Sequence, residues 1–142
     1  MPRASRVVLV LGVALVALAG CSDDSTTPTT PTNFTTTEVY AGTLNRGESG
    51  FYSFNVTNGG TAALTLASVS NAATGRVLDT SMELGLGIPA GEGCNATTTV
   101  TVSPGLSAQI SSTVSTGTYC ARIADIGNLG SAATFAVRIV HP

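Results

Sequence analysis

Lysine and tryptophan are absent from this sequence of 142 residues, and histidine occurs once, as His141. Charged residues make up only 10% of the chain and aromatic residues 5%, so the sequence lacks the basic, aromatic-rich face that nucleic-acid binding requires. Zinc needs clustered His and Cys ligands, and general acid–base catalysis needs two titratable groups brought together. The sequence shows neither pattern, and we therefore expect no metal, no cofactor and no enzymatic activity.

Threonine, serine, glycine, alanine and valine dominate the composition, which favours pleated strands and tight turns over helices. From Glu38 onward, short runs with apolar alternation are separated by Gly, Asn and Pro turns. We expect an all-β fold, an antiparallel β-sandwich of the jelly-roll or immunoglobulin-like type with about eight strands. The expected strands cover residues 39–44, 50–56, 61–68, 81–88, 97–102, 107–114, 118–124 and 133–140.

The expected core consists of the apolar residues that alternate along these strands. They are Tyr52, Phe54, Val56, Leu64, Leu66, Met82, Leu84, Leu86, Ile88, Tyr119, Ile123, Phe135, Val137 and Ile139. Two glycines, Gly85 and Gly87, interrupt one of the runs. Glycine inside a strand lets the backbone bend or another group come close, and we expect that role here.

The first 21 residues have the features of a bacterial export signal. Arg3 and Arg6 precede an uncharged run at 7–19, which has the length of a signal-peptide core. A transmembrane helix would need roughly 20 apolar residues, so this run is too short to span comfortably. It is followed by the sequence LAGC at 18–21, which resembles the lipobox of bacterial lipoproteins. The resemblance implies that Cys21 carries diacylglycerol and often a further acyl chain.

Cleavage between Gly20 and Cys21 would leave four arginines against eight acidic residues, a net charge of 4 − 8 = −4 that disfavours polyanionic partners. Ser22 follows the lipidated residue, where an aspartate would mark retention in the inner membrane under the enterobacterial sorting rule. We therefore expect a lipid-anchored envelope protein, with the outer membrane favoured over the inner. The alternative is an ordinary secretory signal that happens to precede a cysteine.

The segment 21–37 is rich in Thr and Pro and has one large apolar residue, Phe34. Such a segment cannot bury enough surface to offset ordering, and we expect a flexible tether. The expected division is therefore a signal peptide at 1–20, a tether at 21–37 and a β-sandwich domain at 38–142.

Two cysteines, Cys94 and Cys120, remain once Cys21 is lipidated. Export places them in an oxidising compartment, so we expect them to form a disulfide. Closing this loop would stabilise the fold by roughly 3 kcal/mol in the chain-entropy model. The alternative, a reactive thiol, lacks a CxxC neighbour and a nearby histidine in the sequence.

Two stretches of the expected domain resemble bacterial pre-peptidase C-terminal domains. One is GTL at 42–44 followed by GESGFYSFNV at 47–56, and the other is GTYCARI at 117–123. In that family a Gly-Thr-Leu turn leads into a Tyr-Ser-Phe strand, and a Gly-Thr-Tyr strand comes near the end. The resemblance spans roughly residues 38–140 and implies a non-catalytic β-sandwich of the kind appended to secreted proteases. Some members bind calcium and matrix polymers.

The chain departs from that family in two respects. No enzyme is attached in this sequence, so we expect an accessory role to be served from the membrane or in trans. The middle region at 74–80 supplies one carboxylate, whereas many members carry an Asp-rich strand and turn there. Calcium prefers about six to eight oxygen ligands, usually with several carboxylates, so the chain departs here from the calcium-binding members. The single acidic residues are expected to be solvated turn residues, namely Glu38, Glu48, Asp79 and Asp125.

The candidate ligand-binding residues are Phe51 and Tyr40, because exposed aromatic rings can stack on sugars. Phe51 alternates out of phase with Tyr52 and Phe54, which places it on the face opposite to the expected core. The alternative is that both rings pack in the core or at an edge.

These observations together predict a non-catalytic, membrane-anchored lipoprotein whose β-sandwich is a binding or structural module of the cell envelope. Its expected partner, beside the membrane, is an envelope protein or a polysaccharide. Two alternatives stay open: a carbohydrate- or matrix-polymer-binding module, and an accessory domain that acts in trans with a secreted hydrolase.

Overall fold

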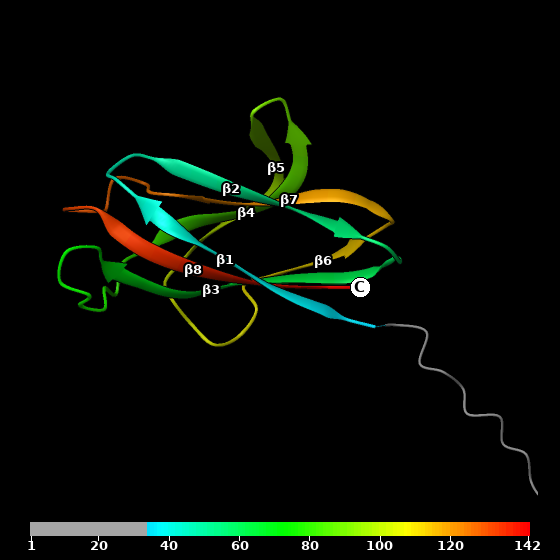
Figure 1. Ribbon diagram of the computed structural model, residues 1–142, viewed down its shortest axis with the longest axis horizontal. Coiled ribbons are helices and arrows are strands. Elements are labelled where there is room, and N and C mark those ends of the chain that lie inside the picture. Colours follow the sequence, from blue (N-terminus) through cyan, green and yellow to red (C-terminus); the bar gives the residue numbers. More distant parts are fainter. Residues whose placement is uncertain (1–33) are drawn as a thin grey trace, which may run out of the picture. The chain divides into compact units, whose positions relative to one another are not determined.

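A computed structural model describes residues 34–142, which form eight β-strands and no helix (Figure 1). The expected all-β class is confirmed. The strands are β1 (Thr36–Leu44), β2 (Ser49–Val56), β3 (Gly60–Asn71), β4 (Met82–Ala90), β5 (Gly93–Val102), β6 (Ile110–Val114), β7 (Gly117–Ala124) and β8 (Ala133–His141).

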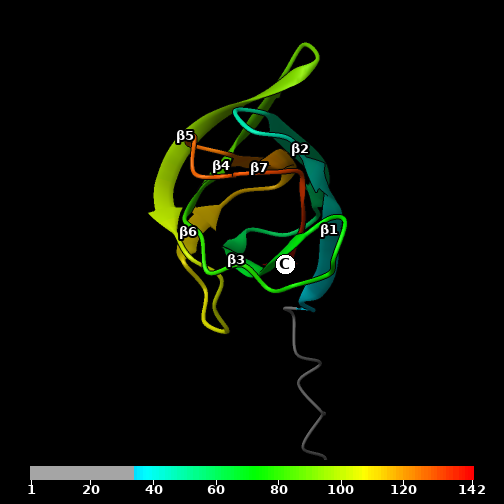
Figure 2. The ribbon, with the colours of Figure 1, turned by 90° about the vertical axis from the view of Figure 1, so that its left-hand side faces the viewer.

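The strands form two antiparallel sheets of four strands each, in the orders β1-β8-β3-β6 and β2-β7-β4-β5. The two sheets face each other across the interior, as the turned view in Figure 2 shows, so the expected sandwich is confirmed. Along the described chain, every connection between consecutive strands passes from one sheet to the other except the connection from β4 to β5. These two strands therefore form a hairpin within one sheet.

Strand boundaries differ from the expected ones where pairing partners lie far away in the sequence. β1 begins at Thr36, two residues before the expected domain boundary, because Thr36 and Thr37 pair with β8. β6 begins only at Ile110, where the regular pairing with β3 starts at Leu64. Just before it, the backbone N–H of Gln109 donates to the carbonyl of Leu64 at 2.9 Å, and the side-chain amide oxygen of Gln109 accepts from the N–H of Leu66 at 2.7 Å.

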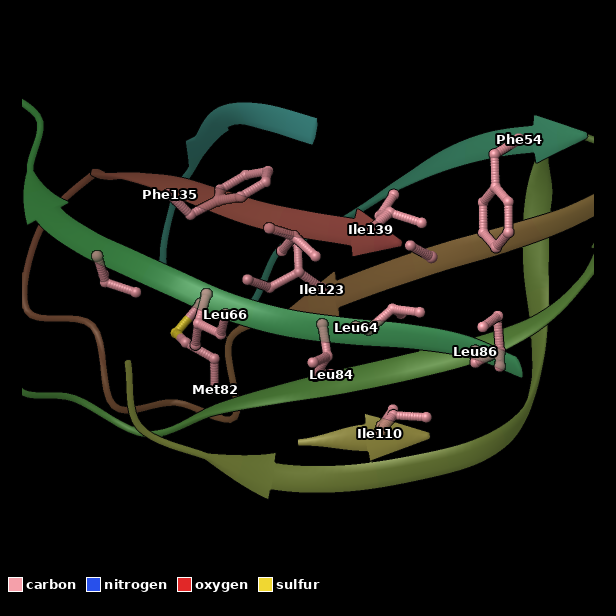
Figure 3. Close-up of a cluster of buried hydrophobic side chains, with 14 of the residues drawn as sticks. Phe54, Leu64, Leu66, Met82, Leu84, Leu86, Ile110, Ile123, Phe135 and Ile139 are labelled. Atoms are coloured by element: carbon pink, nitrogen blue, oxygen red, sulfur yellow. The ribbon is translucent and has the colours of Figure 1, made fainter. Parts of the chain in front are cut away.

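The core between the sheets contains most of the expected side chains, among them Leu64, Leu84 and Ile123 at 0% exposure (Figure 3). Each fully buried side chain of this size stabilises the fold by about 1.5–3 kcal/mol. Tyr52 and Tyr119 are only half-buried. Core residues that the sequence did not indicate are Leu44, Ala62, Val69, Ile110, Val114, Ala121, Leu129 and Ala133.

Ile88 was expected in the core, and this prediction is wrong, because its side chain is 56% exposed. The pairing of β4 with β7 ends at Gly87, so Ile88 lies in the part of the hairpin that has left the sandwich. Alternation along a strand indicates its face but not where the opposite sheet stops covering it.

Asp125 was expected to be a solvated turn residue, and the structure shows it buried at 7% exposure. Its carboxylate accepts hydrogen bonds from the backbone N–H groups of Gly47 at 2.7 Å, Asn128 at 2.9 Å and Leu129 at 3.1 Å. Burial by itself would raise the pKa of Asp125, but these donors outweigh it and the pKa is lowered. The residue thereby ties the β1–β2 turn to the β7–β8 loop.

Candidate functional site

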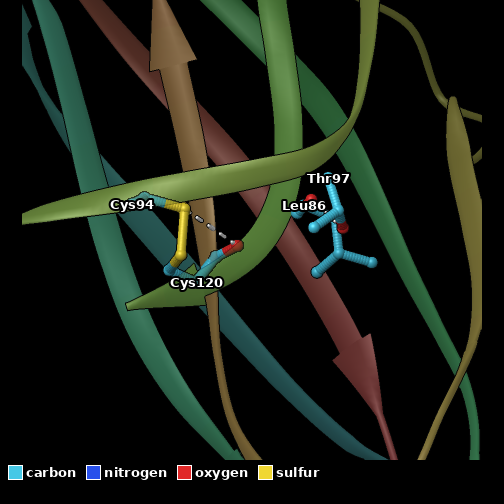
Figure 4. The surroundings of a disulfide bond; sticks show 4 residues. All are labelled: Leu86, Cys94, Thr97 and Cys120. Carbon is cyan, nitrogen blue, oxygen red and sulfur yellow. Dashed lines mark hydrogen bonds between the residues drawn. A yellow bond between two sulfur atoms is a disulfide. The ribbon is translucent and has the colours of Figure 1, made fainter. Parts of the chain in front are cut away.

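The β4–β5 hairpin bends out of its sheet at a β-bulge. Leu86 pairs with Thr98 but Gly87 pairs with Ala96, which leaves Thr97 as the extra residue on β5. The Thr97 hydroxyl donates to the carbonyl of Leu86 at 3.3 Å and secures the irregular turn of the strand. A bulge bends its strand and increases the local twist, and β5 crosses over its neighbours in Figure 4.

Gly87 makes this close approach possible. A Cβ atom at this position would lie 2.0 Å from the carbonyl oxygen of Asn95 and 2.6 Å from the Cα of Ala96, far inside contact distance. At Gly85 a Cβ would lie 3.0 Å from the Cβ of Ala96. The expected role of these two glycines, to let another group come close, is confirmed.

A disulfide holds the bent hairpin over β7. Cys94 of β5 and Cys120 of β7 are at disulfide distance, with an S–S separation of 2.02 Å, as the sequence predicts (Figure 4). In the sheet order β4 lies between these two strands, so the link fixes β5 above its own sheet. Cys120 lies opposite Gly87 and is completely buried beneath the hairpin.

The bent hairpin and the outer face of its sheet line a half-open pocket of about 270 Å³. Its lining comes from three places: Ser49, Gly50 and Phe51 of β2, Arg122 of β7, and Glu92, Gly93 and Cys94 of the hairpin. Phe51 and Arg122 are direct partners in the β2–β7 register and therefore project from the same face. The structure thus places Phe51, a candidate from the sequence, in this pocket at 38% exposure.

Arg122 does not stand alone in the pocket, because its guanidinium forms a hydrogen-bonded ion pair with Glu83 of β4. Both side chains are 31% exposed. The sequence did not indicate Arg122 or Glu92 as site residues, since their approach to Phe51 depends on strand pairing and on the bend of the hairpin. In the sequence, only the pair of glycines that interrupts β4 indicated that another strand comes close to it.

The second aromatic candidate, Tyr40, lies elsewhere. Its ring stacks on Tyr52 with centroids 5.6 Å apart and meets Phe135 edge-on at 5.0 Å. Burial raises the pKa of the Tyr40 hydroxyl. Tyr40 therefore belongs to the aromatic packing around the core, and the structure does not bring it together with Phe51.

A polar cluster of Glu38, Tyr52 and His141 joins the two sheets. The Tyr52 hydroxyl donates to one oxygen of Glu38, and the other oxygen lies 2.9 Å from His141 Nε2. The hydrogen bond from Tyr52 is the main reason that the pKa of Glu38 is lowered; burial opposes it, and His141 adds to it. Glu38 is thus a paired strand residue and not the solvated turn residue that was expected.

The His141 ring in this cluster is only 3% exposed and packs on Phe54 with centroids 4.9 Å apart. A substrate cannot reach a ring covered in this way. We interpret the cluster as a clasp between β1 and β8 on one side and β2 on the other. The sequence could not indicate it, because Glu38 and His141 are separated by 103 positions.

Cys21 and the cleavage site after Gly20 lie outside the described residues. Within residues 34–142 there is no group of three or more His, Cys, Asp or Glu side chains placed to hold a metal ion. That same part of the chain contains no helix long and apolar enough to cross a membrane.

No protein-family model matches this sequence, and no curated protein matches it significantly. The site is therefore interpreted from its own geometry.

Proposed function

We propose that this chain is a non-catalytic lipoprotein of the cell envelope, anchored by lipid on Cys21, whose β-sandwich binds a ligand in the pocket beneath the β4–β5 hairpin. The observation that carries the proposal is the hairpin itself. A bulge, a pair of glycines and a disulfide fix it over Phe51 and Arg122. Because the disulfide fixes the hairpin before a ligand arrives, binding loses less conformational entropy.

The chemistry of the pocket favours binding over catalysis. Ligand sites combine an apolar or aromatic surface with a few converging polar groups, as Phe51, Arg122 and Ser49 do here. The cation is already paired with Glu83, and the remaining ionisable side chain in the lining is Glu92. A general acid and a general base would have to be two groups within reach of one substrate. The resemblance to pre-peptidase C-terminal domains is consistent with this non-catalytic role.

The length of chain between Cys21 and the first strand suits a membrane anchor. β1 begins at Thr36, so 14 residues separate it from Cys21. A chain of that length can span up to roughly 50 Å when extended. Two or three acyl chains on Cys21 would make attachment stable, because one chain alone binds a membrane only marginally. Ser22 favours the outer membrane as the site of residence.

The anchor is tested by substituting Cys21→Ser, and this variant should leave the membrane fraction. Binding is tested by hydrogen exchange on the lipoprotein in native envelopes and after purification in detergent. An occupied pocket slows exchange of the amides at 49–51 and 90–94 in the envelope sample, while the β6–β7 turn at 115–116 serves as the internal control. Equal exchange in both samples at all these amides would contradict a binding role for the pocket.

A further inference from the structure

We infer that the pocket beneath the β4–β5 hairpin binds one neutral sugar unit of a polysaccharide, with the ring of Phe51 as the stacking surface. This inference rests on the proposed binding function and specifies the ligand class. Three features carry it: the aromatic face, the charge balance and the size of the pocket.

The aromatic face comes from Phe51 on the outer side of β2. Its neighbours Tyr52 and Phe54 turn toward the interior, whereas Phe51 stays 38% exposed at the pocket. The face of an aromatic ring carries partial negative charge and attracts the partly positive C–H groups on one side of a sugar ring. A flat apolar face beside polar groups matches a sugar, which presents C–H groups on its face and hydroxyls at its rim.

The charge balance disfavours anionic ligands. Arg122 is neutralised by Glu83, and Glu92 adds a negative charge at the hairpin. An anionic ligand would meet this excess of carboxylate and be repelled by it. A guanidinium has five N–H donors, and the structure assigns one of its nitrogens, Nη1, to Glu83. The remaining donors, with the carboxylate of Glu92 and the hydroxyl of Ser49, suit the hydroxyls of a neutral sugar.

The size of the pocket suits a single sugar unit. Its volume of about 270 Å³ lies just below the range of pockets that enclose drug-sized ligands. One side is formed by β2, which is an edge strand of its sheet. A polysaccharide can therefore place one unit beneath the hairpin while the rest of the chain leaves past this edge.

The experiment is calorimetric titration of the mature lipoprotein in detergent with trisaccharides matched in size. The neutral probes are chitotriose and galactotriose; the glucosamine trimer is the cationic counterpart of the first, and trigalacturonate is the anionic counterpart of the second. We expect a neutral probe to bind and trigalacturonate to bind at least tenfold more weakly than that probe. The same neutral probe should slow hydrogen exchange at 49–51 and 90–94.

Substitutions at Phe51 test whether the sugar binds in this pocket. Phe51→Ala should weaken the neutral probe roughly tenfold, which is the upper range for loss of an aromatic contact. Phe51→Tyr keeps the ring and should keep the affinity. Val39→Ala is the matched control, because Val39 is also an exposed apolar residue, 64% exposed, on an edge strand of the other sheet. Thermal unfolding of each variant verifies that the fold is intact.

Three results would overturn the inference: no neutral probe binds, only a charged probe binds, or affinity is unchanged in Phe51→Ala. Failure of the sugar titration with persisting protection of the pocket amides in native envelopes would refute the sugar and leave the proposed binding function standing. If neither sugar binding nor protection of the pocket amides is observed, the sugar ligand and the proposed binding function are both refuted.

Discussion

Phe51 of β2 and Arg122 of β7 face each other in the strand register, on the outer side of a sheet and beneath a hairpin that the Cys94–Cys120 disulfide holds in place. In a sandwich, the outer face of a sheet ordinarily carries polar residues and faces solvent. Here the bend in β5 converts part of that face into a pocket. The proposed ligand site therefore depends on the bulge, the two glycines and the disulfide, which together keep the hairpin bent.

Removing the disulfide should loosen the hairpin and destabilise the whole domain. For the double variant Cys94→Ala/Cys120→Ala we expect a loss of about 2–4 kcal/mol in the free energy of unfolding, since the crosslink spans 26 residues. Urea unfolding measures the loss, and hydrogen exchange should accelerate most at 90–94. Unchanged exchange at these amides would show that the bulge and the glycines hold the hairpin without the crosslink.

A methyl group at Gly87 should force the hairpin away from its sheet. The added Cβ would meet the backbone of Asn95 at 2.0 Å, and backbone cannot move aside cheaply. We expect Gly87→Ala to cost about 1–3 kcal/mol in unfolding free energy. The control is Gly130→Ala, where no atom lies within 4 Å of the new Cβ; its effect should stay within about 0.5 kcal/mol. Equal effects of the two substitutions would refute the close approach.

Two isoleucines test where the core ends. Ile123 is 0% exposed between the sheets, whereas Ile88 is 56% exposed on the hairpin. Ile123→Ala should lower the free energy of unfolding by about 2–5 kcal/mol. Ile88→Ala should change it by less than about 0.5 kcal/mol. A large loss at Ile88 would mean that the hairpin packs back onto the sandwich.

Acid should weaken the clasp at Glu38. Its pKa in the folded protein is lowered below the ordinary value of 4.5, so folding favours the ionised carboxylate. The resulting stability is fully present above about pH 4.5 and is lost as the pH falls through the folded pKa. Urea unfolding between neutral and acidic pH should show this loss.

The variant Glu38→Gln isolates this contribution, because glutamine keeps the shape of the side chain and does not titrate. Its unfolding free energy should fall less steeply with acid than that of the parent protein. The remaining dependence should come in part from Asp125, whose pKa is also lowered in the fold. Parallel pH curves for the parent and the variant would contradict the role given to Glu38.

The sandwich and most of its core could be predicted because alternation along a strand is a local signal. Phe54, Leu64 and Leu84 follow it and are buried. The disulfide could be predicted by counting, because two cysteines remain once Cys21 is assigned to lipid. These inferences need no knowledge of which strand pairs with which.

The pocket could not be predicted, because it depends on pairing between distant residues. Phe51 meets Arg122 only through the β2–β7 register, and Glu92 reaches them only because β5 bends at Thr97. The same limit explains Ile88, whose alternation is regular but whose strand parts from β7 after the pair of Gly87 and Cys120. Gly85 and Gly87 were the local indication that two strands come close there.

The intact mass of the protein extracted from native membranes, measured before and after reduction, tests the central claim most directly. A lipid-anchored binding module predicts a chain that starts at Cys21, carries the mass of acyl chains and gains two hydrogens when the Cys94–Cys120 disulfide is reduced. A mass without lipid, or a chain that starts at another residue, would contradict the anchor and with it the placement of this pocket at a membrane.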